Sequence, residues 1–245
     1  MYFIANWKMF GNLKSINTIN RVINLAKLTK FRKAKIVYCP PYTILDKFVK
    51  KTKNTRISIG AQNCHHDKNF GPYTGSINAK MIKQTGAKYV ILGHSENRQT
   101  GDTNKIINLK LKLFLIENLN VIICFGEKLA ERKKKKTFRV IKKQIKNGLK
   151  NVKNYKKIIF AYEPVWSIGS GKVLNNKDLE YQIKVIKNYI VKKFKIKNPR
   201  ILYGGSVNPK NINSLVEIRF LKGFLIGSAS QKSKKFIDII KKSIN

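Results

Sequence analysis

The chain has 245 residues, 42% of them hydrophobic, so it can bury a sizeable core and is not intrinsically disordered. Its three cysteines are widely spaced near the ends of apolar runs, which favours buried thiols in a reducing compartment over a disulfide framework. Met1 to Ile4 lacks a basic segment, and no apolar run reaches roughly 18 residues, so we expect no signal peptide and no membrane span. The cytoplasm is the expected location.

The formal net charge of +40 comes from 52 Lys and Arg against 12 Asp and Glu. One interpretation is a polyanionic partner, because such a field binds nucleic acid without sequence preference. The other is compositional drift, which fills solvated helix faces with Lys and changes little else. Nucleic-acid binders usually concentrate their charge in a patch with aromatic residues, whereas here it follows the polar side of nearly every predicted helix. We therefore favour drift and expect nucleic acid to bind only non-specifically, at low salt.

Apolar runs that end at turn-forming or polar residues alternate with segments of helical spacing along the whole chain. In chain order the predicted strand–helix pairs are Tyr2–Met9 with Ser15–Lys27, Ile36–Cys39 with a helix from Thr43, Ile57–Asn63 with a helix ending near Gln84, Lys88–Leu92 with Lys105–Asn118, Val121–Cys124 with Lys133–Lys146, Ile158–Tyr162 with Asn176–Phe194, Arg200–Leu202 with Asn211–Glu217, and Gly223–Ile226 with Lys234–Lys242.

Most of these strands are continuous apolar runs, as expected when both faces of a parallel sheet are buried. A doubly wound open sheet would also alternate strands and helices. Eight units in 245 residues instead fit one α/β domain, residues 1–245, folded as a closed (β/α)8 barrel. In that fold the active site lies at the carboxyl ends of the strands. The polar and small residues at those ends are Asn6, Lys8, His94, Glu96, Glu163, Ser206 and Gly227.

The stretch Ala161 to Gly171, AYEPVWSIGSG, joins the sixth strand to its helix. Glu163 ends the strand, because Pro164 biases the residue before it away from helical geometry. The triplet Gly169-Ser170-Gly171 offers free backbone N–H groups and two flexible joints. This arrangement suits a general base at the root of a mobile, anion-binding lid. The alternative is an ordinary strand-to-helix loop with a Glu on the surface.

Cys64-His65-His66 raises a metal site as a further alternative. No second cluster of ligand-type residues stands at a spacing typical of such sites. We therefore expect no bound metal.

Seven short motifs occur in order along the chain, and together they resemble the triosephosphate isomerase family from end to end. They are Asn6-Trp7-Lys8, GAQN at 60–63, GHSE at 93–96, CFGE at 124–127, AYEPVW at 161–166, YGGSV at 203–207 and GFLIG at 223–227. The resemblance implies a TIM barrel that interconverts dihydroxyacetone phosphate and glyceraldehyde 3-phosphate without a cofactor. It also implies a homodimer that works in glycolysis and gluconeogenesis. The rival classes are another phosphosugar barrel and a polyanion-binding protein that has lost catalysis.

The reaction moves a proton between adjacent carbons through an enediolate, so it needs a base, an electrophile and charge stabilisation. By resemblance Glu163 is the base, and Ile168 and Leu225 are the apolar pair that shuts over it and raises its basicity. His94 begins a short helical turn whose positive end disfavours an imidazolium, so a neutral ring donates to the substrate oxygens. This family is the standard example of that tuning.

By the same resemblance Lys8 supplies positive charge to the enediolate, with Glu96 as its partner and Asn6 as an orienting donor. The substrate phosphate is expected to bind backbone N–H groups. These groups belong to Gly169, Ser206, Gly227 and Ser228. Two of them, those of Gly227 and Ser228, precede a short helical turn.

The chain departs from the family pattern at a few positions. Ser228 stands where the family usually has a second glycine, and Leu174 where a small residue usually closes the lid. Phe220 and Lys222 replace commonly acidic residues. Ser76 and Asn97 replace an acidic residue and an arginine, so both members of an expected cross-subunit ion pair are missing together. Paired loss leaves no charge uncompensated.

Overall fold

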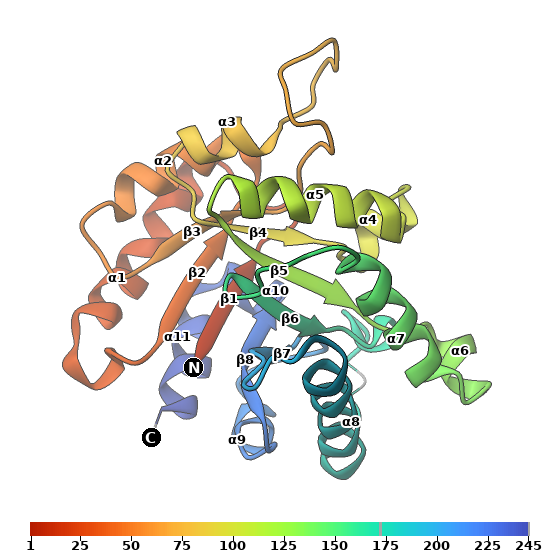
Figure 1. Ribbon diagram of the computed structural model, residues 1–245. Coiled ribbons are helices and arrows are strands. Elements are labelled where there is room, and N and C mark those ends of the chain that lie inside the picture. Colours follow the sequence, from red (N-terminus) through yellow and green to blue (C-terminus); the bar gives the residue numbers. More distant parts are fainter. Residues whose placement is uncertain (172, 245) are drawn as a thin grey trace.

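Eight parallel strands form a closed barrel in chain order, with helices around it (Figure 1). We describe a computed structural model of the chain, residues 1–171 and 173–244. The strands are β1 (Tyr2–Asn6), β2 (Lys35–Cys39), β3 (Ser58–Ala61), β4 (Tyr89–Leu92), β5 (Asn120–Phe125), β6 (Ile158–Tyr162), β7 (Ile201–Tyr203) and β8 (Leu221–Ile226). The predicted fold class is thereby confirmed.

Longer helices cover the outside of the barrel, and short ones shape the loops (Figure 1). The α-helices are α1 (Ile19–Lys27), α2 (Tyr42–Thr52), α3 (Ala79–Gln84), α4 (Ser95–Gln99), α5 (Asn104–Ile116), α6 (Leu129–Lys133), α7 (Thr137–Gly148), α8 (Asn176–Phe194), α9 (Ile212–Val216), α10 (Ser228–Gln231) and α11 (Ser233–Ser243). The 3-10 helices are η1 (Leu13–Thr18), η2 (Thr29–Phe31) and η3 (Val165–Ser167).

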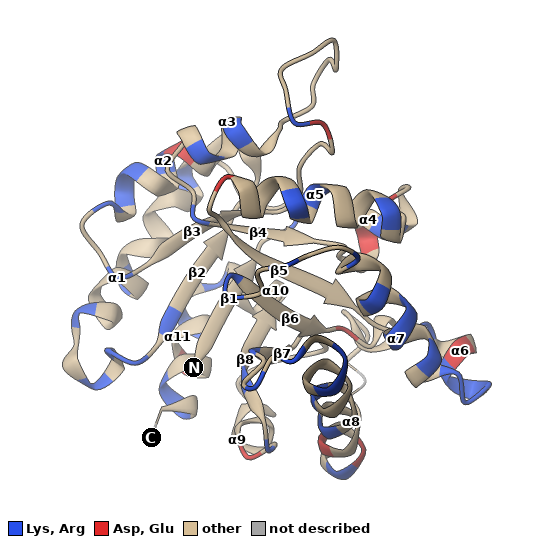
Figure 2. Ribbon diagram, in the orientation of Figure 1, with Lys and Arg blue, Asp and Glu red and all other residues tan. Residues whose placement is uncertain are grey.

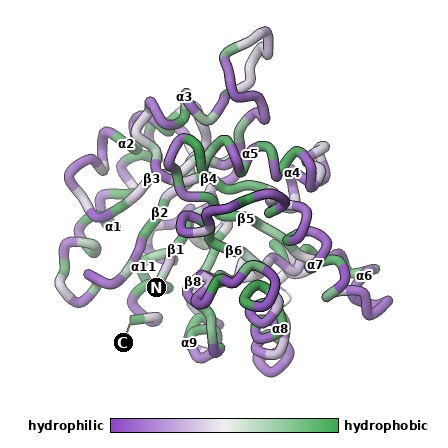
Figure 3. The backbone as a smooth tube through the Cα atoms, in the orientation of Figure 1, coloured by the Kyte–Doolittle hydropathy of each residue, from purple (hydrophilic) through white to green (hydrophobic). Residues whose placement is uncertain are grey.

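The strands separate two hydrophobic clusters, and the green strands of Figure 3 run between purple outer surfaces. In β6, Ile159 and Ala161 belong to the inner cluster, whereas Phe160 packs in the outer one against the helices. Successive side chains of a strand point to opposite faces, so residue 163 continues the inward register. The alternation thus aims the side chain of Glu163 into the mouth of the barrel.

Some predicted boundaries were wrong, and the differences follow local chemistry. The first strand ends at Asn6 and not at Met9, because Lys8 adopts a left-handed backbone with φ of 56°. The predicted helix over residues 133–146 starts later, as α7, and a separate helix α6 precedes it. Lys135, at φ 54°, breaks the helical path between them. A run of lysines carries no turn signal, so the sequence did not show this break.

The backbones after β5 and β6 approach so closely that only glycine fits at position 126. The N–H of Glu163 donates to the carbonyl oxygen of Phe125 at 2.8 Å. A Cβ atom on Gly126 would lie 1.7 Å from the carbonyl oxygen of Glu163. The absent side chain at position 126 therefore fixes where the backbone of Glu163 lies.

We expect Gly126→Ala to destabilise the fold by about 1–3 kcal/mol, since the contact is with backbone and cannot be relieved by a rotamer change. Gly148→Ala is the control, because its added methyl group would meet the movable Cδ1 of Ile123 at 2.9 Å. Denaturant unfolding of both variants measures the difference. Equal stability of the two variants would contradict this role for Gly126.

Candidate active site

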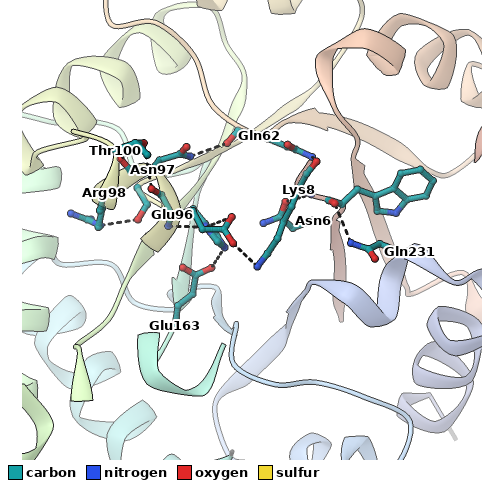
Figure 4. Close-up of polar contacts among 12 residues, drawn as sticks. Asn6, Lys8, Gln62, Glu96, Asn97, Arg98, Thr100, Glu163 and Gln231 are labelled. Carbon is teal, nitrogen blue, oxygen red and sulfur yellow. Dashed lines mark hydrogen bonds and ion pairs between the residues drawn. The ribbon is translucent and has the colours of Figure 1, made fainter. Parts of the chain in front are cut away.

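A cavity of about 530 Å³ opens at the carboxyl ends of the strands. Figure 4 shows side chains from separate strand ends meeting there, with Glu163 directed toward Glu96 and Lys8. Residues far apart in sequence line this cavity, and they include Asn6, Lys8, His94, Glu163, Ile168, Gly169, Ser206, Leu225, Gly227 and Ser228. Among the described residues, the structure therefore gathers every predicted site residue except Glu96 around one space.

Glu163 is 2% exposed at the end of β6. Burial away from water raises the pKa of its carboxyl group, because desolvation disfavours the charged form. His94, the Cys124 thiol and Lys8 oppose that rise in the pKa. The result is a buried carboxylate of increased basicity, aimed into the cavity, and not the surface Glu of the alternative interpretation.

His94 lies at the N-terminal cap of α4 and is 5% exposed. Its Nδ1 atom accepts the backbone N–H of Glu96 at 3.3 Å, so that nitrogen carries a lone pair and not a proton. A neutral ring in this state has its proton on Nε2, which lies 3.6 Å from Oε1 of Glu163. The helix start therefore places Nε2 of His94 beside the buried carboxylate.

Lys8 lies opposite, and hydrogen bonds from three directions hold its strained backbone. Its N–H donates to Oδ1 of Asn6 at 3.1 Å, and its carbonyl oxygen accepts from Gln62 at 2.9 Å. Gln231 donates to the carbonyl oxygen of the preceding Trp7 at 3.2 Å. The ammonium group of Lys8 pairs with Glu96 at 2.7 Å. The left-handed turn thus directs a cation toward the cavity.

Glu96 stands beside the cavity, with a side chain that is 53% exposed. It lines a smaller hollow behind Lys8 and His94, together with Asn97. Its position suits a partner of Lys8 more than a group that touches a ligand in the main cavity.

The other end of the cavity is formed by backbone. Gly227 caps the four-residue helix α10, which Ser228 begins without a left-handed angle, so the serine fits where the family usually has glycine. The N–H of Ser206 lies 3.4 Å from Oγ of Ser167. Gly169 takes φ of 69° with open space around it. Gly169, Ser206, Gly227 and Ser228 thus line this end of the cavity, together with Lys232 and Lys235.

Two polar networks were missed as site elements by the sequence analysis. Glu127 is fully buried, and it accepts hydrogen bonds from Nε1 of Trp166 at 3.0 Å and from the hydroxyl of Tyr162 at 3.2 Å. Arg98 donates to the carbonyl oxygens of Gly93 at 2.7 Å and Cys124 at 3.0 Å. The first network holds the start of the predicted lid, and the second ties two strand ends together. The signal for Glu127 was present, since it also ends a strand.

At the far end of the predicted lid, Leu174 is 4% exposed and packs in the outer hydrophobic cluster. The predicted lid, Pro164 to Leu174, includes Lys172, which lies outside the described residues. Both described ends of the segment are therefore anchored, one by Glu127 and one by apolar packing.

A closed barrel that gathers a buried carboxylate, an imidazole and a lysine around one cavity at the carboxyl ends of its strands has the architecture of a (β/α)8-barrel enzyme. A model of the triosephosphate isomerase family matches residues 1–243. A triosephosphate isomerase of Wolbachia pipientis is 42% identical over 238 residues, covering 97% of this chain and 91% of that protein. One from Alkaliphilus oremlandii is 37% identical, with 96% of each chain covered.

The crystal structure of a triosephosphate isomerase from Bartonella henselae superposes with a TM-score of 0.89. It is 33% identical in sequence, and the match covers 98% of both chains. The chain belongs to the triosephosphate isomerase family, and it is an isomerase. The resemblance that the seven motifs indicated is thereby confirmed.

We expect the carboxyl group of Glu163 to keep its proton at pH values where exposed glutamates, with pKa values of about 4.3, have lost theirs. A side-chain carbon-13 titration of the seven glutamates measures this. Burial also raises the pKa of Glu127, so Glu163→Gln is needed to assign the resonance of Glu163. A Glu163 resonance that titrates together with those of exposed glutamates would refute the expectation.

Proposed function

We propose that Glu163, His94 and Lys8 carry out the interconversion of dihydroxyacetone phosphate and D-glyceraldehyde 3-phosphate. The observation that carries this assignment is the buried Glu163 carboxylate 3.6 Å from Nε2 of His94, in one cavity with Lys8. A base and a donor this close can act on neighbouring atoms of one small substrate.

Glu163 removes a proton from the carbon next to the carbonyl group, which leaves an enediolate and a protonated carboxyl group. The Nε2–H of His94 donates to the substrate oxygens, and the ammonium group of Lys8 stabilises the negative charge. Nε2 of His94 gives its proton to the former carbonyl oxygen and takes the hydroxyl proton of the neighbouring oxygen. Glu163 then returns its proton to the adjacent carbon, so atoms and charge balance without any cofactor. Asn6 positions Lys8 through the hydrogen bond to its backbone N–H.

The substrate phosphate binds at the cradle of Gly169, Ser206, Gly227 and Ser228, at the other end of the cavity. Ile168 and Leu225 line the same cavity and keep water from the carboxylate when the segment after Glu163 closes. Trp166, whose Nε1–H donates to Glu127, is the fixed end about which that segment moves. A dry site strengthens the electrostatic interactions on the enediolate.

Glu163→Gln tests this assignment, because it keeps the shape and removes the proton acceptor. We expect kcat to fall at least about 10²-fold, with little change in substrate affinity. Glu217→Gln is the control, since Glu217 is exposed at the end of α9. A coupled isomerisation assay on purified protein measures both variants. Turnover near the parent value in Glu163→Gln would remove Glu163 from the role of base.

The charge does not favour the polyanion-binding alternative. Lys and Arg are spread over nearly all of the helices in Figure 2, and they do not form one face. We propose that the net charge leads to non-specific binding of nucleic acid at low salt and to no specific polyanion partner. No helix among the described residues is long and apolar enough to cross a membrane. Three buried free cysteines fit the reducing cytoplasm as the location.

We also propose a homodimer built on the long loop between β3 and α3, residues 63–76, which projects from the body of the molecule (Figure 1). Phe70 is 65% exposed at its tip and Tyr73 is 44% exposed, so the loop presents apolar surface that a second chain can cover. Ser76 is exposed on the loop, and Asn97 hydrogen-bonds to the carbonyl oxygen of Gln62 at 3.4 Å. Neither residue contributes a charge to the interface.

We expect this dimer to loosen, with loss of activity, as ionic strength falls. Each chain carries +40, and screening acts beyond about 8 Å at physiological salt but only beyond about 30 Å in dilute buffer. Repulsion between whole subunits responds to that change, whereas apolar packing does not. Sedimentation velocity at fixed low protein concentration and without nucleic acid, across a salt series, measures it. A dimer equally tight at low and physiological salt would show that packing dominates.

A further inference from the structure

The projecting loop carries three consecutive residues with metal-ligating side chains, outside the catalytic cavity. Nδ1 of His65 lies 3.4 Å from Oδ2 of Asp67, and Nε2 of His66 lies 3.9 Å from the same oxygen. One ligand atom from each residue falls within 4.8 Å of the other two. Among the described residues this is the only group of at least three such side chains with that spacing.

These separations are close to those around a bound transition-metal ion. Donor atoms on a tetrahedral zinc ion at about 2.0–2.2 Å lie roughly 3.3–3.6 Å from one another. The His65–Asp67 pair already has that spacing, and Nε2 of His66 lies 3.9 Å from the same Asp67 oxygen. The sequence alone argues against a metal ion at the histidine pair, because no second ligand cluster stands at a typical spacing. The third ligand is instead the next residue, brought around by a bend in the loop.

Neighbouring contacts orient these side chains. The ring of His65 stacks between His66, at a centroid distance of 4.5 Å, and Tyr73, at 4.4 Å. The N–H of His65 donates to the carbonyl oxygen of Ile77 at 2.8 Å, which ties the start of the loop to its end. Such outer contacts hold metal ligands in position.

Nδ1 of His65 also accepts the backbone N–H of Asp67 at 3.3 Å. The lone pair of this nitrogen therefore faces the backbone N–H of Asp67, and a metal ion would replace that hydrogen bond. Two imidazoles and one carboxylate form a ligand set that suits zinc, cobalt, nickel or copper. Magnesium and calcium prefer several oxygen ligands.

We propose that His65, His66 and Asp67 form a binding site for one divalent transition-metal ion on the projecting loop, completed by water. The charge of the chain opposes any cation, and Lys68 is the next residue. Ions held mainly by charge are disfavoured in that field, whereas ions with strong bonds to neutral imidazole tolerate it better. The site uses no group of the catalytic cavity, so it stands or falls independently of the isomerase mechanism.

The test is a titration of the full chain, purified without a polyhistidine tag and stripped with a chelator. Cobalt(II) followed by visible absorption and zinc(II) followed by calorimetry give stoichiometry and affinity. We expect one ion per chain and no detectable heat with magnesium. His66→Asn and Asp67→Asn should each weaken binding at least about tenfold, as loss of a ligand or of its support does. Both side chains are partly exposed, so circular dichroism should show unchanged folding.

Two matched variants separate this site from other ligands. Cys64→Ser removes the buried thiol next to the cluster, and Asp46→Asn removes an exposed carboxylate paired only with Lys50. Both variants should bind the metal ions as the parent does. His94 is unchanged in every variant, and it should not add a second ion to the stoichiometry of one. Absence of stoichiometric binding would overturn the proposal. So would full affinity in both His66→Asn and Asp67→Asn, or loss of binding in Cys64→Ser.

Discussion

Closure of the barrel between β1 and β8 is the constraint on which the rest of the structure depends. The two strands pair in parallel, with Tyr2 opposite Gly223. A Cβ atom on Gly223 would lie 2.0 Å from the carbonyl oxygen of Tyr2, so the approach requires glycine. This pairing brings Lys8, from the beginning of the chain, into the same cavity as Gly227 near its end. An open sheet with the same elements would leave the lysine and the cradle on opposite edges, and no common cavity would form.

The same closure buries the carboxyl group of Glu163, which is costly for the fold. Burial raises the pKa of Glu163, so the folded state binds its proton more tightly than the unfolded state does. The resulting destabilisation is absent below the unfolded pKa and fully present above the raised folded pKa. Backbone pairing between β5 and β6 holds Glu163 in this position. Gly126 and Gly204 leave room for its backbone and its side chain. Burial thus makes the Glu163 carboxylate more basic and lowers the free energy of unfolding at pH values above the raised folded pKa.

Several of the few acidic residues in this lysine-rich chain make buried or paired contacts at strand ends and loops. Glu163 and Glu127 are buried at strand ends, and Glu96 pairs with Lys8. Asp102 pairs with the buried Lys110 at 2.6 Å and supports the loop after α4. The excess of lysine lies on the outer helices, where Coulomb energies are small and screened. The charge therefore alters encounters between molecules more than it alters the inside of the barrel.

The sequence by itself determined the number and order of strands, the closed fold and the residues around the cavity, because apolar runs and their polar ends are local patterns. It also placed Glu163 and Lys8 at strand ends, and it predicted a lid that contains Gly169 after β6. It could not show that Lys8 turns left-handed, because that strain is held by Gln62 and Gln231 from distant elements. Nor could it show that Asp67 joins the two histidines, or that Glu127 holds Trp166. These arrangements depend on side-chain directions and contacts across the sequence, and only the packed tertiary structure decides them.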